Sequence, residues 1–130
     1  MNAELQTNND ACGLRMENIK MYPDQSGGSC DLEVISLPFR ANIRFFFDWP
    51  PLNQFVEQLE DIEQSLSGEA TLGQQFEEPY IKFKGNGLGH IEVSGLLIVY
   101  NENIQKLEFS FTTDQTAVGP FIEELRSVVQ

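Results

Sequence analysis

Basic residues are scarce in this chain of 130 residues, which has eight lysines and arginines against 20 aspartates and glutamates. The formal net charge of -12 repels phosphate backbones and anionic lipid headgroups. Nucleic acid and membrane surfaces are therefore unfavourable partners, and a basic protein or a cation is a better match. An acidic surface can also serve only to keep a protein in solution, and this alternative explains the composition equally well.

Cysteine and histidine are also rare. Two cysteines, Cys12 and Cys30, are too few for a disulfide framework, and their spacing is not that of a zinc site. We interpret both as reduced thiols of a cytoplasmic protein. The single histidine, His90, is the only residue on which a Ser-His-Asp or Cys-His arrangement could be built. It follows a glycine-rich run at residues 85–89, and a hydrogen bond to the hairpin backbone explains it better than catalysis does.

Motifs for catalysis, cofactor binding and metal binding are absent from the sequence. The glycines at residues 85–89 match neither the dinucleotide-binding nor the Walker A spacing. Adjacent carboxylates such as Glu77 and Glu78 point in different directions, whereas glycosidase chemistry needs two that converge. Neither an EF-hand pattern nor H-E-x-x-H occurs. We therefore predict a protein that is not an enzyme and has no catalytic, cofactor-binding or metal-binding residues.

Long apolar runs are missing too. The first ten residues, MNAELQTNND, contain neither the basic region nor the apolar run of a secretory signal. No stretch approaches the ~18 consecutive apolar residues of a membrane span. We expect a cytoplasmic protein with no membrane partner.

Apolar residues are nevertheless plentiful, at 41% of the chain with ten phenylalanines. This supply can fill one core without a metal or a disulfide. Residues 1–17 are polar and aperiodic, so we expect a flexible N-terminal segment there, followed by a single α+β domain over residues 18–130. A short strand near residues 18–22 and a loop over residues 23–29 precede the main body of this domain.

Hydrophobic periodicity alternates between two and 3.6 residues along the rest of the chain. Alternation predicts strands over residues 30–37, 41–49, 70–76, 80–84, 90–100 and 104–113. Apolar residues within an arc of about 120° predict two amphipathic helices, over residues 50–66 and from a cap at Thr116 to residue 129. Because the turns between strands are short, we predict an antiparallel meander sheet with both helices packed on one face, an α+β fold.

Several short motifs resemble a known family. The chain reads GNGLGHIEV over residues 85–93, LEFSF over residues 107–111 and DQT over residues 114–116, and QLE at 58–60 leads to LSGEA at 66–70. In this order and at these distances they resemble the WapI-type immunity proteins, which accompany bacterial contact-dependent toxins. The resemblance runs from about Asp31 to the C-terminus and departs at Ala117, where the family usually carries an aromatic residue. It implies a cytoplasmic protein that binds and neutralises a cognate toxin domain, with no catalytic residues.

A partner-binding face is predicted on the outer side of the first helix and the segment before it. Acidic residues there would steer a basic toxin domain into contact, and aromatic residues are favoured at interface centres. The predicted face comprises Phe46, Asp48, Trp49, Glu57, Glu60 and Asp61. Phe46 interrupts the polar side of its strand, which indicates either a covered face or an exposed apolar patch. A half-buried position of Trp49 in the core is the alternative.

Two other functions stay open at this point. The chain could be an acidic interaction module without a toxin partner, or a small ligand-binding protein that uses His90. A toxin-like gene beside this one would favour immunity over the interaction module. The sequence predicts no oligomeric state and does not identify the toxin.

Overall fold

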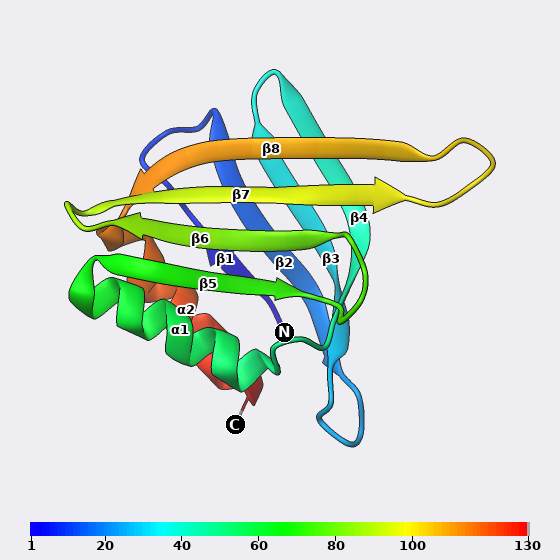
Figure 1. The fold of residues 1–130 in the computed structure, drawn as a ribbon, viewed down its shortest axis with the longest axis horizontal. Coiled ribbons are helices and arrows are strands. Elements are labelled where there is room, and N and C mark those ends of the chain that lie inside the picture. Colours follow the sequence, from blue (N-terminus) through cyan, green and yellow to red (C-terminus); the bar gives the residue numbers. More distant parts are fainter. Residues whose placement is uncertain (130) are drawn as a thin grey trace.

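The computed structural model describes residues 1–129, which form two helices and eight strands (Figure 1). The first sheet contains β1 (Ala3–Leu5), β2 (Cys12–Met21), β3 (Gly28–Ser36) and β4 (Phe39–Phe47). The second sheet contains β5 (Ser67–Gly73), β6 (Tyr80–Asn86), β7 (His90–Val99) and β8 (Gln105–Asp114). The helices are α1 (Leu52–Ser65), which joins the sheets, and α2 (Gln115–Val129), which follows the last strand.

Each sheet is an antiparallel meander whose strands lie in sequence order. The α+β content and the antiparallel pairing agree with the sequence prediction, but there are two sheets where a single one with both helices on one face was predicted. The reason is that α1 separates β4 from β5, so no tight turn pairs them. Trp49, two residues after β4, forms an isolated bridge with Gly73 at the end of β5.

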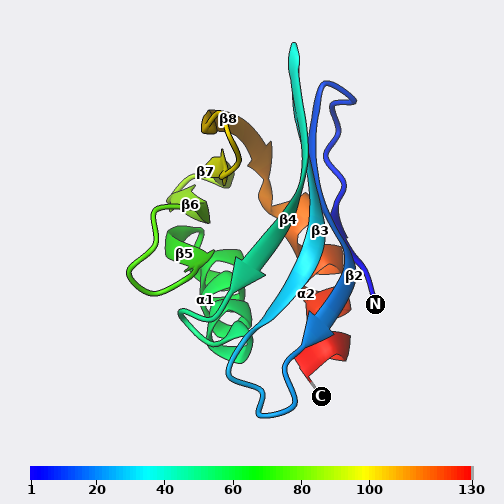
Figure 2. The ribbon, with the colours of Figure 1, turned by 90° about the vertical axis from the view of Figure 1, so that its right-hand side faces the viewer.

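The two sheets face a common core, and the helices close one side of it (Figure 2). α2 packs against the edge strand β1 and against α1, while α1 packs against the edge strand β5. Each helix is amphipathic, so its apolar stripe covers the core and its polar side faces water. The helix pair thus bridges the edges of the two sheets instead of covering one face of a single sheet.

Aromatic side chains join the helices to the second sheet. Phe83 of β6 is fully buried, and its ring lies 5.7 Å from that of Phe121 on α2 and 6.0 Å from that of Phe55 on α1, measured between ring centroids. Offset and edge-to-face pairs at these separations stabilise a core beyond the area they bury. The three rings therefore fix the position of the helix pair on the sheet.

The N-terminal residues form β1 and the start of β2 in the first sheet, where a flexible segment was expected over residues 1–17. Ala3 and Leu5 of β1 and Leu14 and Met16 of β2 are all buried. A strand of three residues is too short to show a period in sequence, and its order comes from pairing with β2 and packing against α2. The backbone N–H of Glu4 also donates to a carboxylate oxygen of α2 at 3.2 Å.

The second helix begins one residue before the predicted cap. Asp114, and not Thr116, is the capping residue, because its Oδ1 accepts hydrogen bonds from the backbone N–H of Thr116 at 3.0 Å and from the Thr116 hydroxyl. The hydrogen bond from that hydroxyl is the main cause that lowers the pKa of Asp114 below its ordinary value. Pro120 lies within the helix, near its start. The first helix begins at Leu52, two residues later than predicted, with Pro51 as the residue that precedes it.

Candidate functional site

The two helices carry a concentration of negative charge. α1 has four acidic residues and no basic one, and α2 has two acidic residues and a single basic one, Arg126. We call the surface formed by these side chains the acidic helix layer. Its carboxylates belong to Glu57, Glu60, Asp61, Glu63, Glu123 and Glu124.

The inner stripe of α1 determines which carboxylates face water. Five apolar residues of this helix are buried, and they occupy the side that faces the core. Glu57 and Asp61 are exposed and are four residues apart, so they are neighbours on the outer side. Glu60 is different, because its Oε1 lies 3.1 Å from both Nε and Nη2 of Arg126. Glu60 thus ties α1 to α2, whereas Glu57 and Asp61 form no ion pair among the described residues.

The other three residues of the predicted face lie before α1. The Oδ1 of Asp48 accepts a hydrogen bond from the backbone N–H of Gln75 at 2.9 Å, which fastens the loop after β5 to this segment. Trp49 is 57% exposed, so the alternative that it is a half-buried core residue is wrong. Phe46 is 45% exposed and therefore forms part of an apolar surface patch.

The predicted face divides into two groups in the structure. Glu57 and Asp61 lie on the outer side of α1, whereas Phe46 lines a groove between β4 and the end of β7. Asp48 and Trp49 lie in the segment that connects the two. Among the described residues, no hydrogen bond or ion pair joins the helix carboxylates to the β4 residues. Sequence reasoning missed the groove because its walls come from strands more than 50 residues apart.

The side chain of Asn86 holds the hairpin that contains His90. The Oδ1 of Asn86 accepts hydrogen bonds from the backbone N–H groups of Leu88 at 2.7 Å and His90 at 3.2 Å. Gly87 and Gly89 have φ angles of 84° and 95°, which favour glycine. A shallow pocket of about 250 Å³ adjoins the hairpin. The turn therefore accounts for the glycines at positions 87 and 89. The hydrogen bond at His90 comes from its own backbone N–H, so a bond from its imidazole to the hairpin backbone stays a prediction.

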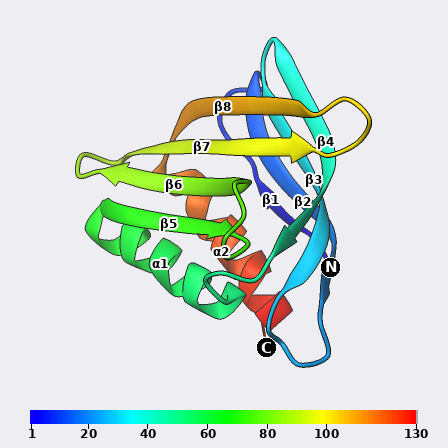
Figure 3. The ribbon, with the colours of Figure 1, turned by 45° about the vertical axis from the view of Figure 1, so that its right-hand side comes forward.

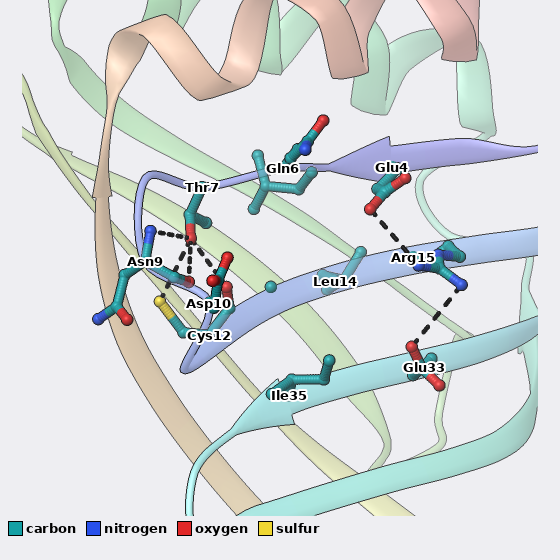
Figure 4. Close-up of a pocket in the computed structure, with 12 residues that line it drawn as sticks. Glu4, Gln6, Thr7, Asn9, Asp10, Cys12, Leu14, Arg15, Glu33 and Ile35 are labelled. Atoms are coloured by element: carbon teal, nitrogen blue, oxygen red, sulfur yellow. Dashed lines mark hydrogen bonds and ion pairs between the residues drawn. The ribbon is translucent and has the colours of Figure 1, made fainter.

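A second pocket, of about 150 Å³, lies against the first three strands (Figure 4). The hydroxyl of Thr7 is within 2.8 Å of the carbonyl oxygens of Asn9 and Cys12, and it accepts from the backbone N–H of Asn9 at 3.1 Å. On the other side, Arg15 is surrounded by carboxylates, the nearest being Glu17 at 2.9 Å. These polar groups satisfy one another, so this pocket has no obvious ligand chemistry.

The described residues 1–129 contain no group of three or more His, Cys, Asp or Glu side chains arranged to hold a metal ion. Neither helix in this part of the chain is long and apolar enough to cross a membrane.

Comparison with known proteins gives one match. The model of the immunity protein WapI-like family matches residues 8–130, which contain every element except β1. Neither the curated proteins nor the solved structures give a match to this chain. The family resemblance seen in the sequence from about Asp31 onward is confirmed, and the match extends it to include β2. The chain belongs to the immunity protein WapI-like family.

Proposed function

We propose that this chain is a cytoplasmic immunity protein that binds a cognate toxin domain and neutralises it by covering the toxin's active site. Membership of the WapI-like immunity family supports the class of activity. The observation that supports the mode of binding is the acidic helix layer, which contains six carboxylates and one guanidinium. The partner surface that suits this layer is basic.

The charges of the layer favour rapid encounter with such a partner. Glu57 and Asp61 are exposed and take part in no ion pair within residues 1–129. A patch of one sign attracts a surface of the opposite sign over distances of about a Debye length, and this raises the association rate at low salt. Glu60 contributes less, since Arg126 already neutralises it.

An aromatic anchor lies next to the start of the layer. Trp49 is exposed and comes three residues before α1, and Asp48 and Gly73 hold its backbone in place. An exposed tryptophan on a fixed backbone can be buried by a partner at low cost in side-chain entropy, because tryptophan has only two χ angles. Trp49 is therefore our candidate for the centre of the toxin interface, with Glu57 and Asp61 beside it on the helix.

Growth rescue tests this proposal. A cognate toxin domain, identified among neighbouring genes by its ability to stop growth, is expressed in bacteria together with wild-type protein or with the Glu57→Lys, Asp61→Lys double variant. We expect wild-type protein to restore growth and the double variant to fail at matched expression, because the reversed charges repel the basic toxin.

A matched control separates the position of the charges from their number. The Asp10→Lys, Glu92→Lys variant makes the same change in net charge at exposed sites outside the acidic helix layer. It should rescue growth as wild type does. If both double variants rescue equally well, the acidic helix layer is not the toxin-binding face. If wild-type protein gives no rescue, the immunity function itself is wrong.

A further inference from the structure

The outer edge of β4 is unpaired over most of its length. β4 is the last strand of the first sheet, with β3 as its only neighbour there. Beyond Phe47 the edge is closed by Gly73, which exchanges hydrogen bonds with the backbone of Trp49 at 3.0 and 3.1 Å. Within residues 1–129, no backbone hydrogen bond joins residues 39–46 to a segment other than β3. Alternate N–H and C=O groups of these eight residues therefore point outward without a partner strand.

An apolar groove runs beside this edge, and its walls come from β4 and from the ends of β7 and β8. Figure 3 shows the ribbons of these three strands. The groove consists of two adjoining cavities of about 430 and 380 Å³, which share Asn42, Ile43 and Val99 in their walls. We call it the β4 groove. Its apolar lining includes Phe39, Ala41, Ile43, Phe46, Leu97, Val99, Tyr100 and Leu107.

Several of these apolar side chains are left in water. Phe39 and Tyr100 are 61% and 62% exposed, and Phe46 and Val99 are exposed as well. Single exposed apolar residues are normal, but a group of them around a groove marks an interaction site. A partner that covers the group would remove large aromatic surface from water, which favours binding.

The charge of the β4 groove is opposite to that of the rest of the protein. The chain has 20 acidic residues, yet none lines either cavity, whereas Arg40, Arg44 and Lys106 do. Arg44 pairs with Asp31 at 3.1 Å, and Lys106 pairs with Glu78 at 3.5 Å. Arg40 has no ion-pair partner among the described residues. The groove therefore offers one free guanidinium beside an apolar surface.

We propose that the β4 groove binds an extended, apolar segment of a partner protein that carries a carboxylate. The segment adds to the free edge of β4 as a further strand, places alternate apolar side chains in the two cavities, and sets its carboxylate against Arg40. In strand addition of this kind, main-chain hydrogen bonds provide affinity and the pockets select the side chains. This site is separate from the acidic helix layer and takes a ligand of the opposite charge, so it goes beyond the proposed function.

Two other occupants fit less well. Nucleic acid is repelled by the net charge of -12, and one free guanidinium cannot follow a phosphate backbone. A second copy of this chain would pair β4 with β4. Antiparallel pairing centred on Asn42 sets Arg40 opposite Arg44, and like charges directly opposite each other destabilise a sheet.

Selection from a library of random peptides of about ten residues, long enough to span the free edge, tests the proposal. We expect enriched peptides to alternate apolar residues and to contain Asp or Glu. A synthetic enriched peptide should bind wild-type protein, and hydrogen exchange should show new protection of β4 amides. Arg40→Glu should weaken binding by about tenfold or more, and a peptide with its carboxylate changed to Lys should regain affinity for that variant.

Controls keep this test apart from the proposed function. Val99→Glu adds a carboxylate to the groove wall at an exposed site and should also weaken binding of the acidic peptide. The Glu57→Lys, Asp61→Lys variant, which should lose toxin rescue, should bind the peptide as wild type does. The proposal would be overturned if no acidic peptide were enriched, or if Arg40→Glu left peptide binding unchanged. Self-association or oligothymidine binding that depends on Arg40 would also overturn it, because either would assign the groove to another occupant.

Discussion

The thiol of Cys30 belongs to the hydrophobic core and is fully buried. Desolvation is the main cause that raises its pKa to about 12, and the nearby charge of Asp31 adds to the shift. Because the thiolate is the reactive form, a thiol with so high a pKa is almost inert at neutral pH. This agrees with the interpretation of the cysteines as reduced structural residues.

Thiol labelling should therefore separate the two cysteines. In the native protein, iodoacetamide at mildly alkaline pH should modify Cys12, which is only partly buried, well before Cys30. In denaturant the two rates should become similar, because the desolvation that protects Cys30 is lost. Peptide mass spectrometry after timed labelling measures both rates. Equal labelling in the native protein would show that Cys30 is open to solvent.

The carboxylate of Asp114 stabilises the start of α2. Replacing Asp114 by alanine removes the acceptor for the Thr116 N–H and should lower the free energy of unfolding by about 1 kcal/mol at neutral pH. The pKa of Asp114 is depressed in the folded state, so its contribution is present above the ordinary Asp pKa of about 3.9. The contribution is lost as the pH falls through the lower, folded value.

Urea unfolding of wild type and Asp114→Ala across acidic pH measures this effect. The two curves should differ most at neutral pH and approach each other under strongly acidic conditions, where the part of the contribution that depends on the carboxylate charge is lost. Asp114→Asn keeps an acceptor but not the charge, so its stability should lie between those of wild type and Asp114→Ala at neutral pH. A difference that persists unchanged at low pH would show that Asp114 acts through something other than its charge.

At the scale of elements, β1 shows how much order the N-terminus has. Leu5→Ala should lower the free energy of unfolding by about 2–4 kcal/mol, because Leu5 is buried and its removal leaves a cavity. Gln6→Ala, at the next and exposed position, is the control and should change stability by less than about 0.5 kcal/mol. Chemical denaturation compares the two. If Leu5→Ala behaves like Gln6→Ala, β1 does not pack as described.

Most elements and the antiparallel pairing of consecutive strands were predictable from sequence, but the division into two sheets was not. The pattern of Leu52, Phe55 and Leu59 identifies α1 because an apolar stripe has the same spacing wherever the helix packs. The same pattern does not say that α1 would separate two sheets and bridge their edges. For the same reason, Phe46 and Trp49 could be recognised as unusual, but the β4 groove depends on β7 and β8 meeting β4 in space.

At the scale of the whole molecule, charge is distributed unevenly. The acidic helix layer concentrates carboxylates, whereas the lining of the β4 groove has three basic residues and none that is acidic. The predicted binding face therefore included parts of two surfaces with different chemistry. Glu57 and Asp61 are better sites for charge reversal than Glu60, because a change at Glu60 would also break its ion pair with Arg126.

The rate at which this protein associates with a cognate toxin domain tests the central claim most directly. Stopped flow measures this rate at about 0.05 M and about 0.5 M salt. The proteins compared are wild type, the Glu57→Lys, Asp61→Lys double variant and the Asp10→Lys, Glu92→Lys double variant as control. We predict fast, strongly salt-dependent association of wild type, a similar rate for the control, and a rate for the helix variant that is at least about tenfold slower at low salt. Equal rates for the helix variant and wild type at low salt would contradict binding through the acidic helix layer.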